Sequence, residues 1–197
     1  ESARKIDTVV LPLGPYRNLT TMSAALYALH PNALVLNHAA VRVFGSAIDP
    51  FADLSEDRWL TFKTGALRMA QHGRSGRFGG NVLRSHAFGQ EELLRVYEAR
   101  FGKDLRKPGA TALFWKDSMR FQNRFMAQPE MFDELLARQP QVRFLFPVRN
   151  PLDCARSNLR TGHWRHLVPE GPEFDKVLRR ILESLSWFRR RERVDPG

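Results

Sequence analysis

The junction between a strand and a helix within residues 142–157 constrains the fold of this chain more than any other feature. Residues 142–148 are apolar or aromatic with a single charge, which predicts a strand covered on both faces. Asn150 is a good N-cap, Pro151 suits the first helical position, and Asp153 falls in the first turn, where the helix dipole favours negative charge. We therefore predict that a helix begins at residue 150 or 151.

Two residues at this junction are able to face one anionic group. Arg149 follows the predicted strand directly, and Ser157 lies about two turns along the helix. Ligands bind at strand ends in an open α/β sheet, although a surface arginine and an ordinary helix serine would give the same residues. A second junction near the amino terminus, residues 7–13 followed by Gly14 and Arg17, favours the binding interpretation. Two such junctions suggest one ligand with two phosphate-like ends.

The first junction has the features of a phosphate cradle. Gly14 permits an unusual backbone angle, and the amides of residues 17–21 are unpaired donors at a helix start, which bind anions. Arg17 adds a planar, fixed positive charge, and Thr20 and Thr21 add two hydroxyl donors. The alternative is a capped helix whose threonines only satisfy backbone groups.

The same loop argues against a nucleotide kinase or ATPase. Such a loop needs Gly-Lys-[Ser/Thr] at its end, and this chain has Leu19, Thr20 and Thr21 there. We find no acidic residue after a strand as a clear magnesium ligand, and no His/Cys/Asp spacing typical of a metal site. A sulfuryl group carries less charge than a phosphoryl group, so arginine, lysine and amides can handle it without a metal.

The order of apolar runs predicts an α/β fold, a three-layer α/β/α sandwich with a central parallel sheet, formed by residues 1–197 as a single domain. In the predicted helix near the amino terminus, the stripe that we expect to face the core consists of Leu19, Met22, Leu26 and Leu29. The predicted strands are 7–13, 33–37, 81–86, 110–116 and 142–148, and the predicted helices are 19–30, 55–70, 90–101, 119–127, 129–138, 151–160 and 173–191.

Composition and charge limit the classes of ligand and the cellular compartment that we expect. The net charge of +10 favours polyanions, phosphorylated small molecules or acidic membrane surfaces without choosing among them. Cys154 is the only cysteine, so an intramolecular disulfide or a cysteine zinc cluster is impossible. We find no apolar run near the ~20 residues of a membrane span and no secretion signal, so we expect a cytoplasmic protein.

Together, the two junctions resemble those of sulfotransferases that use 3′-phosphoadenosine 5′-phosphosulfate (PAPS). In that family a loop Lys/Arg-Ser-Gly-Thr-Thr binds the 5′-phosphosulfate, and Arg-[Asn/Asp]-Pro-x-Asp-x-x-x-Ser binds the 3′-phosphate. The second motif matches residues 149–157 in full. The first matches residues 17–21 in part, because Asn18 replaces the serine and Leu19 the glycine. The resemblance implies a P-loop NTPase-like fold and no metal.

The resemblance also assigns roles to residues. Arg17, Thr20 and Thr21, in the loop with Gly14, Asn18 and Leu19, would hold the 5′-phosphosulfate, and Arg149 and Ser157 would hold the 3′-phosphate. Catalysis would fall to His86, Lys116 and Arg17. His86 resembles the general base that ends a strand in cytosolic members, with His38 as its competitor. Lys116 would stabilise the bridging oxygen or only pair with Asp117.

Several alternatives remain open. The acceptor would be a hydroxyl or amine of a small molecule, carbohydrate or lipid, and we expect neither a nucleic-acid partner nor a membrane span. His163 and His166 either touch the ligand or belong to a solvated loop. The rival functions are a P-loop-type kinase acting on a small molecule and a basic nucleic-acid-binding protein. The family's later loop that closes over the cofactor is missing, so either the pattern is broken or a carboxyl-terminal segment lies outside this chain.

Overall fold

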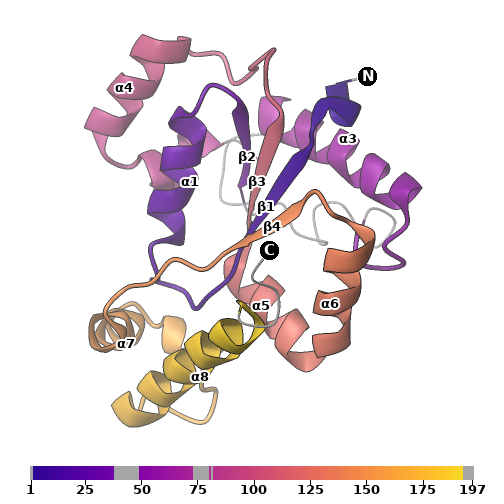
Figure 1. Cartoon of the computed structure of the whole chain (residues 1–197). Coiled ribbons are helices and arrows are strands. Elements are labelled where there is room, and N and C mark those ends of the chain that lie inside the picture. The colour runs from indigo at the N-terminus through magenta and orange to yellow at the C-terminus, as the bar shows by residue number, and fades with distance from the viewer. Residues whose placement is uncertain (1, 38–48, 73–79, 81, 193–197) are drawn as a thin grey trace.

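A four-stranded parallel sheet forms the centre of the molecule in a computed structural model that describes residues 2–37, 49–72, 80 and 82–192. The strand order is β2-β3-β1-β4, and every pair is parallel, so all four carboxyl ends lie at one edge (Figure 1). This confirms the predicted α/β class with a parallel sheet. The strands are β1 (Thr8–Pro12), β2 (Ala33–Asn37), β3 (Ala112–Lys116) and β4 (Val142–Leu145).

Helices cover both faces of the sheet, as predicted for an α/β/α arrangement. One face packs on α1 (Thr20–Leu29) and α4 (Glu91–Phe101), through a cluster that includes Ala24, Ala28 and Tyr97. The other packs on helices that contribute aromatic side chains to a larger cluster. These helices are α3 (Glu56–His72), α5 (Ser118–Ala127) and α6 (Pro129–Arg138).

Alternation along the strands divides the two clusters. Val9 is in register with Leu113 and Val142, and all three side chains belong to the cluster on the α3 side. Val10 and its partner Phe114 point to the α1 side. The period-2 pattern of a sheet buried on both faces therefore assigns each side chain of β1 to one of two cores.

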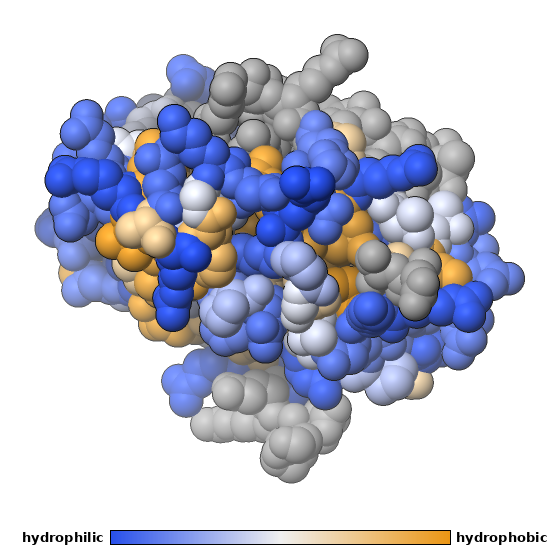
Figure 2. Space-filling view, turned by 90° about the horizontal axis from the view of Figure 1, so that it is seen from above, coloured by the Kyte–Doolittle hydropathy of each residue, from blue (hydrophilic) through white to orange (hydrophobic). Residues whose placement is uncertain are grey.

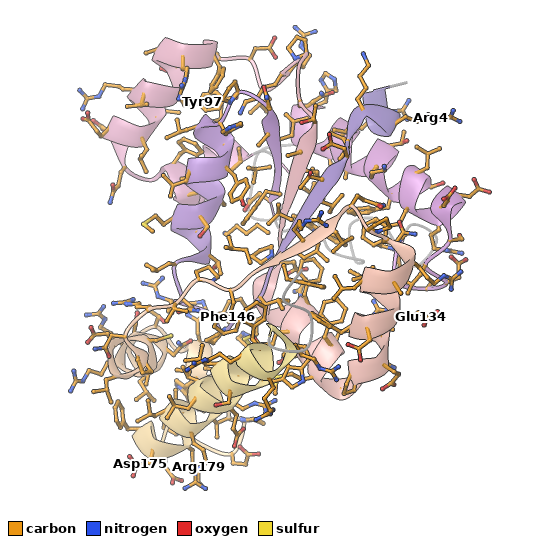
Figure 3. The ribbon with its side chains drawn as sticks, in the orientation of Figure 1. Arg4, Tyr97, Glu134, Phe146, Asp175 and Arg179 are labelled. Carbon is orange, nitrogen blue, oxygen red and sulfur yellow. The ribbon has the colours of Figure 1, made fainter. Side chains whose placement is uncertain are left out.

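The carboxyl-terminal part of the chain forms a third, smaller cluster. It lies between α7 (Pro151–Arg160), a 3₁₀ turn at His163–His166 and α8 (Phe174–Glu192). Ring contacts join this part to the rest of the molecule: Phe146, labelled in Figure 3, stacks on Phe188 at 5.0 Å, and Phe132 of α6 meets Trp187 at 5.4 Å. The segment between β4 and α7 therefore passes between two cores.

The predicted strand 81–86 is wrong. Val82–Arg84 and His86–Phe88 are 3₁₀ helices, with Ser85 between them. The Ser85 hydroxyl donates to the Val82 carbonyl at 2.6 Å and accepts from the Ala87 amide at 3.1 Å. A serine that bonds its own backbone in this way offers the chain an alternative to a strand ladder.

The strand predicted for residues 142–148 ends at Leu145, and it is not covered on both faces. It lies at the edge of the sheet, Arg143 is exposed, and Val148 is 64 % exposed. Pro147 has no N–H with which to continue a ladder. The helix that follows is as predicted: Asn150 caps α7 by accepting from the Leu152 amide at 2.9 Å, and Pro151 is its first residue.

The apolar stripe predicted for α1 is also wrong. Met22 is 50 % exposed and Leu26 57 % exposed, whereas small residues of the same helix are buried. Small side chains bring a helix close to a sheet, and here that close approach prevails over the burial of leucine. The buried residues of α1 are Thr20, Ser23, Ala24, Ala25 and Ala28.

Two surface features complete the description. None of the helices in the described ranges is long and apolar enough to span a lipid bilayer. Figure 2 shows the molecule from above, at the edge where the strands begin; its surface is mainly hydrophilic, with apolar areas between the charged side chains.

The packing of α1 makes a first prediction. Leu26→Ala should change the free energy of unfolding by less than about 0.5 kcal/mol, because the side chain already faces solvent. Ala25→Leu, one residue earlier, should lower it by about 1–3 kcal/mol by overfilling the space beneath the helix. Urea unfolding followed by circular dichroism measures both. A larger loss of stability for Leu26→Ala than for Ala25→Leu would indicate that Leu26 faces the core, as the sequence pattern predicts.

Candidate anion-binding site

The connections of two neighbouring strands diverge at the carboxyl edge of the sheet. From β1 the chain passes to α1 on one face, and from the neighbouring strand β3 it passes to α5 on the other. Neighbouring strands whose connections leave in opposite directions form a switch point, where ligands bind in open α/β sheets. The loop after β1 and the end of β3 therefore occupy the position at which a ligand site is expected.

The loop between β1 and α1 has an unusual backbone. Gly14 has φ 115°, which confirms the special angle expected there, and Arg17 and Leu19 have φ 65° and 61°. Residues other than glycine with positive φ are uncommon and gather at functional sites. Leu19 is the N-cap of α1 in the left-handed region, which explains why a glycine would suit this position. Left-handed residues at a helix start arrange backbone amides as a concave set of donors.

Asn18 joins the two predicted junctions. Its side chain is 4 % exposed; Nδ2 donates to the Pro147 carbonyl, and Oδ1 accepts from the Arg149 amide at 3.2 Å. A Cβ added at Gly14 would lie 3.0 Å from the same Nδ2, so glycine is also required for space. The Asn18 side chain therefore clamps the loop after β1 to the segment that follows β4.

The clamp brings Arg17, Arg149 and Ser157 together. The Arg17 Nε donates to the Ser157 Oγ at 3.0 Å, and the Arg149 Nη1 donates to the Arg17 carbonyl at 3.3 Å. Ser157 is 3 % exposed, whereas Arg17 is exposed. The Arg17 guanidinium thus contacts a buried hydroxyl, and the Arg149 guanidinium contacts the backbone of Arg17. Thr20 is buried at the start of α1, and Thr21 is partly exposed.

Helix α7 holds the same loop from below through the Tyr16 carbonyl. The Asn158 Nδ2 donates to that carbonyl at 2.9 Å, and the Cys154 Sγ lies 3.6 Å from it. Burial raises the pKa of the Cys154 thiol to about 11, against the opposing effects of Arg149, Asn158 and Arg17. A thiol with this pKa stays protonated near neutral pH, so Cys154 is a structural donor and not a nucleophile.

The Tyr16 ring packs on the two histidines of the turn after α7. Its centroid lies 5.2 Å from that of His163 and 5.4 Å from that of His166. His163 Nδ1 is also 2.7 Å from the hydroxyl of Thr161, which donates to the Ser157 carbonyl. The two histidines therefore contact the candidate loop through the Tyr16 ring, while His166 is also exposed to solvent.

Lys116 ends β3, and the register of that strand with β1 puts it level with Pro12, two residues before Gly14. It is 2 % exposed, and its Nζ lies 3.5 Å from Asn37 Oδ1. Burial lowers the pKa of the Lys116 amine to about 8, and Asp117 opposes that shift. Asp117 itself lies 3.3 Å from Arg120.

Neither candidate base, His86 or His38, has a side chain in the described part of the molecule. His86 begins a 3₁₀ helix and does not end a strand, and its side chain lies outside the described part of the molecule. His38, the competitor, falls among residues 38–48, which the structure does not describe.

Three contributing residues were missed by the sequence analysis: Tyr16, Asn37 and Asn158. Asn158 directly follows Ser157, and Asn37 ends a predicted strand, so their positions were the available signals. Tyr16 contributes its carbonyl, for which a sequence holds no signal.

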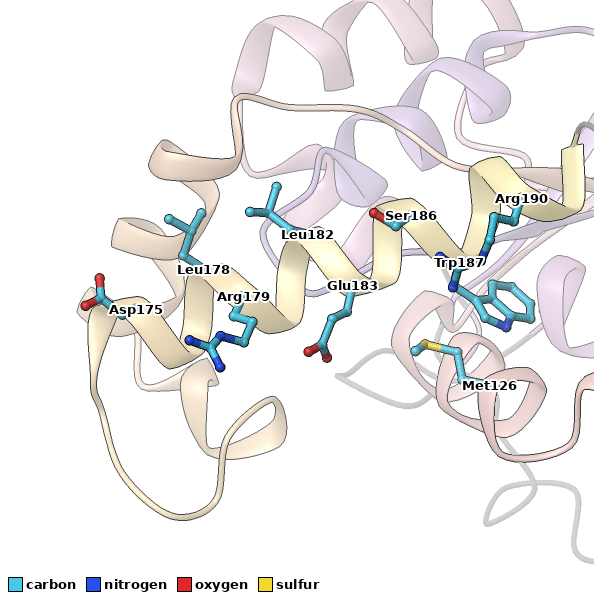
Figure 4. Close-up of a pocket in the computed structure, with 9 residues that line it drawn as sticks. All are labelled: Met126, Asp175, Leu178, Arg179, Leu182, Glu183, Ser186, Trp187 and Arg190. Atoms are coloured by element: carbon cyan, nitrogen blue, oxygen red, sulfur yellow. The ribbon is translucent and has the colours of Figure 1, made fainter.

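Other features of the described residues lie away from this loop. An open groove of about 690 Å³ between α5 and α8 has a lining that includes Met126, Leu182 and Trp187, and none of the predicted site residues (Figure 4). Among the described side chains, no three of His, Cys, Asp or Glu gather as a metal site would require.

In comparisons with known proteins, the chain matches no protein-family model, and no curated protein sequence is similar to it.

The left-handed cap makes a second prediction. Leu19→Gly should change the free energy of unfolding by less than about 1 kcal/mol, because relief of the strained φ offsets the flexibility that glycine adds. Leu19→Val should lower it by about 1–2 kcal/mol, since a β-branched residue resists positive φ. Thermal unfolding of the two variants beside the unmodified chain tests this. Equal tolerance of valine and glycine would mean that residue 19 is not held in the left-handed region.

Buried Lys116 makes a third prediction, on pH. The pKa of this amine is about 8 in the folded chain against 10.5 as its ordinary value, so between these pH values the unfolded chain binds more protons and stability rises with pH. Lys116→Met should therefore raise the free energy of unfolding at pH 7, by on the order of 3 kcal/mol.

That gain should shrink as the pH rises from 8 to 10.5. Denaturant unfolding across this pH range measures the gain in stability. Lys107, a second buried lysine, is present in both proteins, so any titration of its amine cancels from the comparison. A gain independent of pH would show that the Lys116 amine does not titrate in this window.

Proposed function

We propose that the chain is a PAPS-dependent sulfotransferase that moves a sulfuryl group to a hydroxyl or amine of a small-molecule, carbohydrate or lipid acceptor. One observation carries the proposal: the loop at residues 14–21 and the Arg149–Ser157 motif, matched separately in the sequence, meet through the contact of Arg17 with Ser157 at 3.0 Å. Such a meeting puts residues of the two motifs at one position, as binding of a single anionic ligand by both motifs requires. A P-loop NTPase-like fold is part of the same proposal.

The charges at this position support an anionic ligand. In the described part of the chain, the ion pairs include neither Arg17 nor Arg149. Their guanidinium groups donate instead to a hydroxyl and a backbone carbonyl, which are neutral. Two adjacent cations without a carboxylate repel each other, and an anion between them would remove that repulsion.

The residues present fit the proposed cofactor. The left-handed Leu19 and the first-turn amides of α1 suit the 5′ end, and Arg149 with the buried Ser157 suits the 3′-phosphate. When bound, PAPS supplies a sulfuryl group activated by its link to a phosphate. The chain's own contribution would be to hold the leaving phosphate with Arg17 and loop amides, and to place Lys116 near the bridging oxygen.

A base must also take the proton of the acceptor. We propose His86 for this role, with His38 as the alternative, because an imidazole titrates near neutral pH. Loss of transfer in His86→Ala with unchanged cofactor binding would support His86. Survival of transfer would move the role to His38.

The fourth prediction concerns binding of the product nucleotide, 3′-phosphoadenosine 5′-phosphate. Calorimetry should detect binding to the unmodified chain, and Arg149→Ala should weaken it at least tenfold, because a bidentate arginine–phosphate contact contributes more than 1.4 kcal/mol. Arg156→Ala is the matched control: it removes the same charge from the exposed side of α7, where Arg156 lies 3.6 Å from Asp153, and it should retain affinity.

Two further outcomes separate the rivals. AMP should bind much more weakly than the bisphosphate, and equal affinity would contradict a 3′-phosphate site. EDTA should leave transfer unchanged, and inhibition by EDTA would favour the metal-dependent kinase.

A further inference from the structure

The strongest unexplained feature at the sheet edge is the amide of Asn37. This residue ends β2, is 0 % exposed, and is in register with Lys116 at the end of β3. Its Oδ1 accepts from the Lys116 Nζ, but its Nδ2 is buried and has no hydrogen-bond partner in the described structure. A buried donor without a partner costs free energy in folding and calls for a physical explanation.

The direction of the two side chains follows from the sheet. Val35 and Phe114, two residues before Asn37 and Lys116, pack on the α1 side, so alternation puts Asn37 and Lys116 on that side as well. Helix α1 packs on both β2 and β3 there and begins at Thr20, at the same edge of the sheet. The Asn37 amide, the Lys116 amine and the positive end of the α1 dipole thus lie on the same face of the sheet, at its carboxyl edge.

We propose that Asn37 Nδ2 and Lys116 Nζ together bind one anionic oxygen of a sulfuryl or phosphoryl group. Asn37 Oδ1 would hold the lysine in place, and its Nδ2 would donate to the same oxygen that the lysine contacts. The inference rests on the proposed function for the identity of that oxygen, which is a terminal oxygen of the transferred group, next to the bridging oxygen near which Lys116 is placed above. It adds a donor, Asn37, that the sequence analysis does not include.

The electrostatics favour this assignment. Both groups are buried away from bulk water. In such a site, a preorganised pair of donors interacts strongly with an anionic oxygen and need not reorganise. Burial lowers the pKa of the Lys116 amine, so an anion beside it should raise that pKa towards its ordinary value. The competing explanation is a buried water that accepts from Nδ2.

The experiment observes Lys116 directly. The protein is labelled with ¹³C at the lysine Cε, and the Lys116 signal is identified by its absence in Lys116→Met. Its pH titration is then followed with inorganic sulfate and with chloride at equal ionic strength. Sulfate should raise the pKa of Lys116 in the unmodified chain, with a saturable dependence on concentration.

Two variants at one position separate the roles of Asn37. Asn37→Leu removes both polar atoms, whereas Asn37→Asp keeps the oxygen that accepts from Lys116 and replaces only the donor. Sulfate affinity read at Lys116 should fall at least tenfold in both. The control Asn123→Leu, at an exposed position of α5, should bind sulfate as before.

The inference is overturned if sulfate leaves the Lys116 titration unchanged, as expected when only water occupies the position. It is also overturned if Asn37→Leu binds sulfate as tightly as the unmodified chain. The proposed function fails separately, if 3′-phosphoadenosine 5′-phosphate does not bind or binds without dependence on Arg149. A response of Lys116 to sulfate alone would then retain the subsite and reject the nucleotide.

Discussion

The hydrogen bonds of the Asn18 side chain are the constraint on which the candidate site depends. They tie the loop after β1 to the backbone of Pro147 and Arg149, segments about 130 residues apart in the chain. Each segment alone is a basic loop at a strand end. Joined by the clamp, they present two guanidinium groups to the same space, which neither loop could do by itself. The like charges of Arg17 and Arg149 oppose this arrangement, so neutral groups must hold it.

Those neutral groups come from two elements, the loop after β1 and α7. Asn18 acts from the loop, Asn158 acts from α7 on the Tyr16 carbonyl, and Ser157 accepts from Arg17. All three are at least nine-tenths buried, which shields their hydrogen bonds from competition with water. The order of the site is therefore established before any ligand binds. A site prepared in this way loses less entropy on binding than a mobile loop would.

Much of the fold followed from local chemistry, and the failures have identifiable causes. The cap at Asn150 and the parallel sheet were predictable because each depends on neighbouring residues or on simple alternation. The exposure of Leu26 was not predictable, because the distance between α1 and the sheet decides which face of the helix packs on the sheet. The 3₁₀ turns around Ser85 were missed because one serine hydroxyl outweighed an apolar run.

The residues around the site also divide into those that the sequence predicted and those that only the fold shows. Arg149 and Ser157 were found because their spacing is fixed by one helix, and Gly14 because its angle requires glycine. Lys107 shows what a sequence conceals: it is 6 % exposed, and its Nζ donates to the carbonyls of His30 and Ala33, both at 2.8 Å. A lysine in a loop predicts a solvated charge, and only the fold shows that it closes the end of α1 onto β2.

The position of the site between two cores has a consequence for stability. The loop after β1 belongs to the sheet, whereas Ser157 lies on α7, beside the cluster of α7 and α8, and the side chains that join the two parts include Phe146 and Trp187. An anion held by residues from both sides would bind only when they are together, and would therefore stabilise the joined state by mass action. Asn158 and Cys154 of α7 meet the loop after β1 at the Tyr16 carbonyl, so the joining of the two parts and the order of that loop depend on the same few polar contacts.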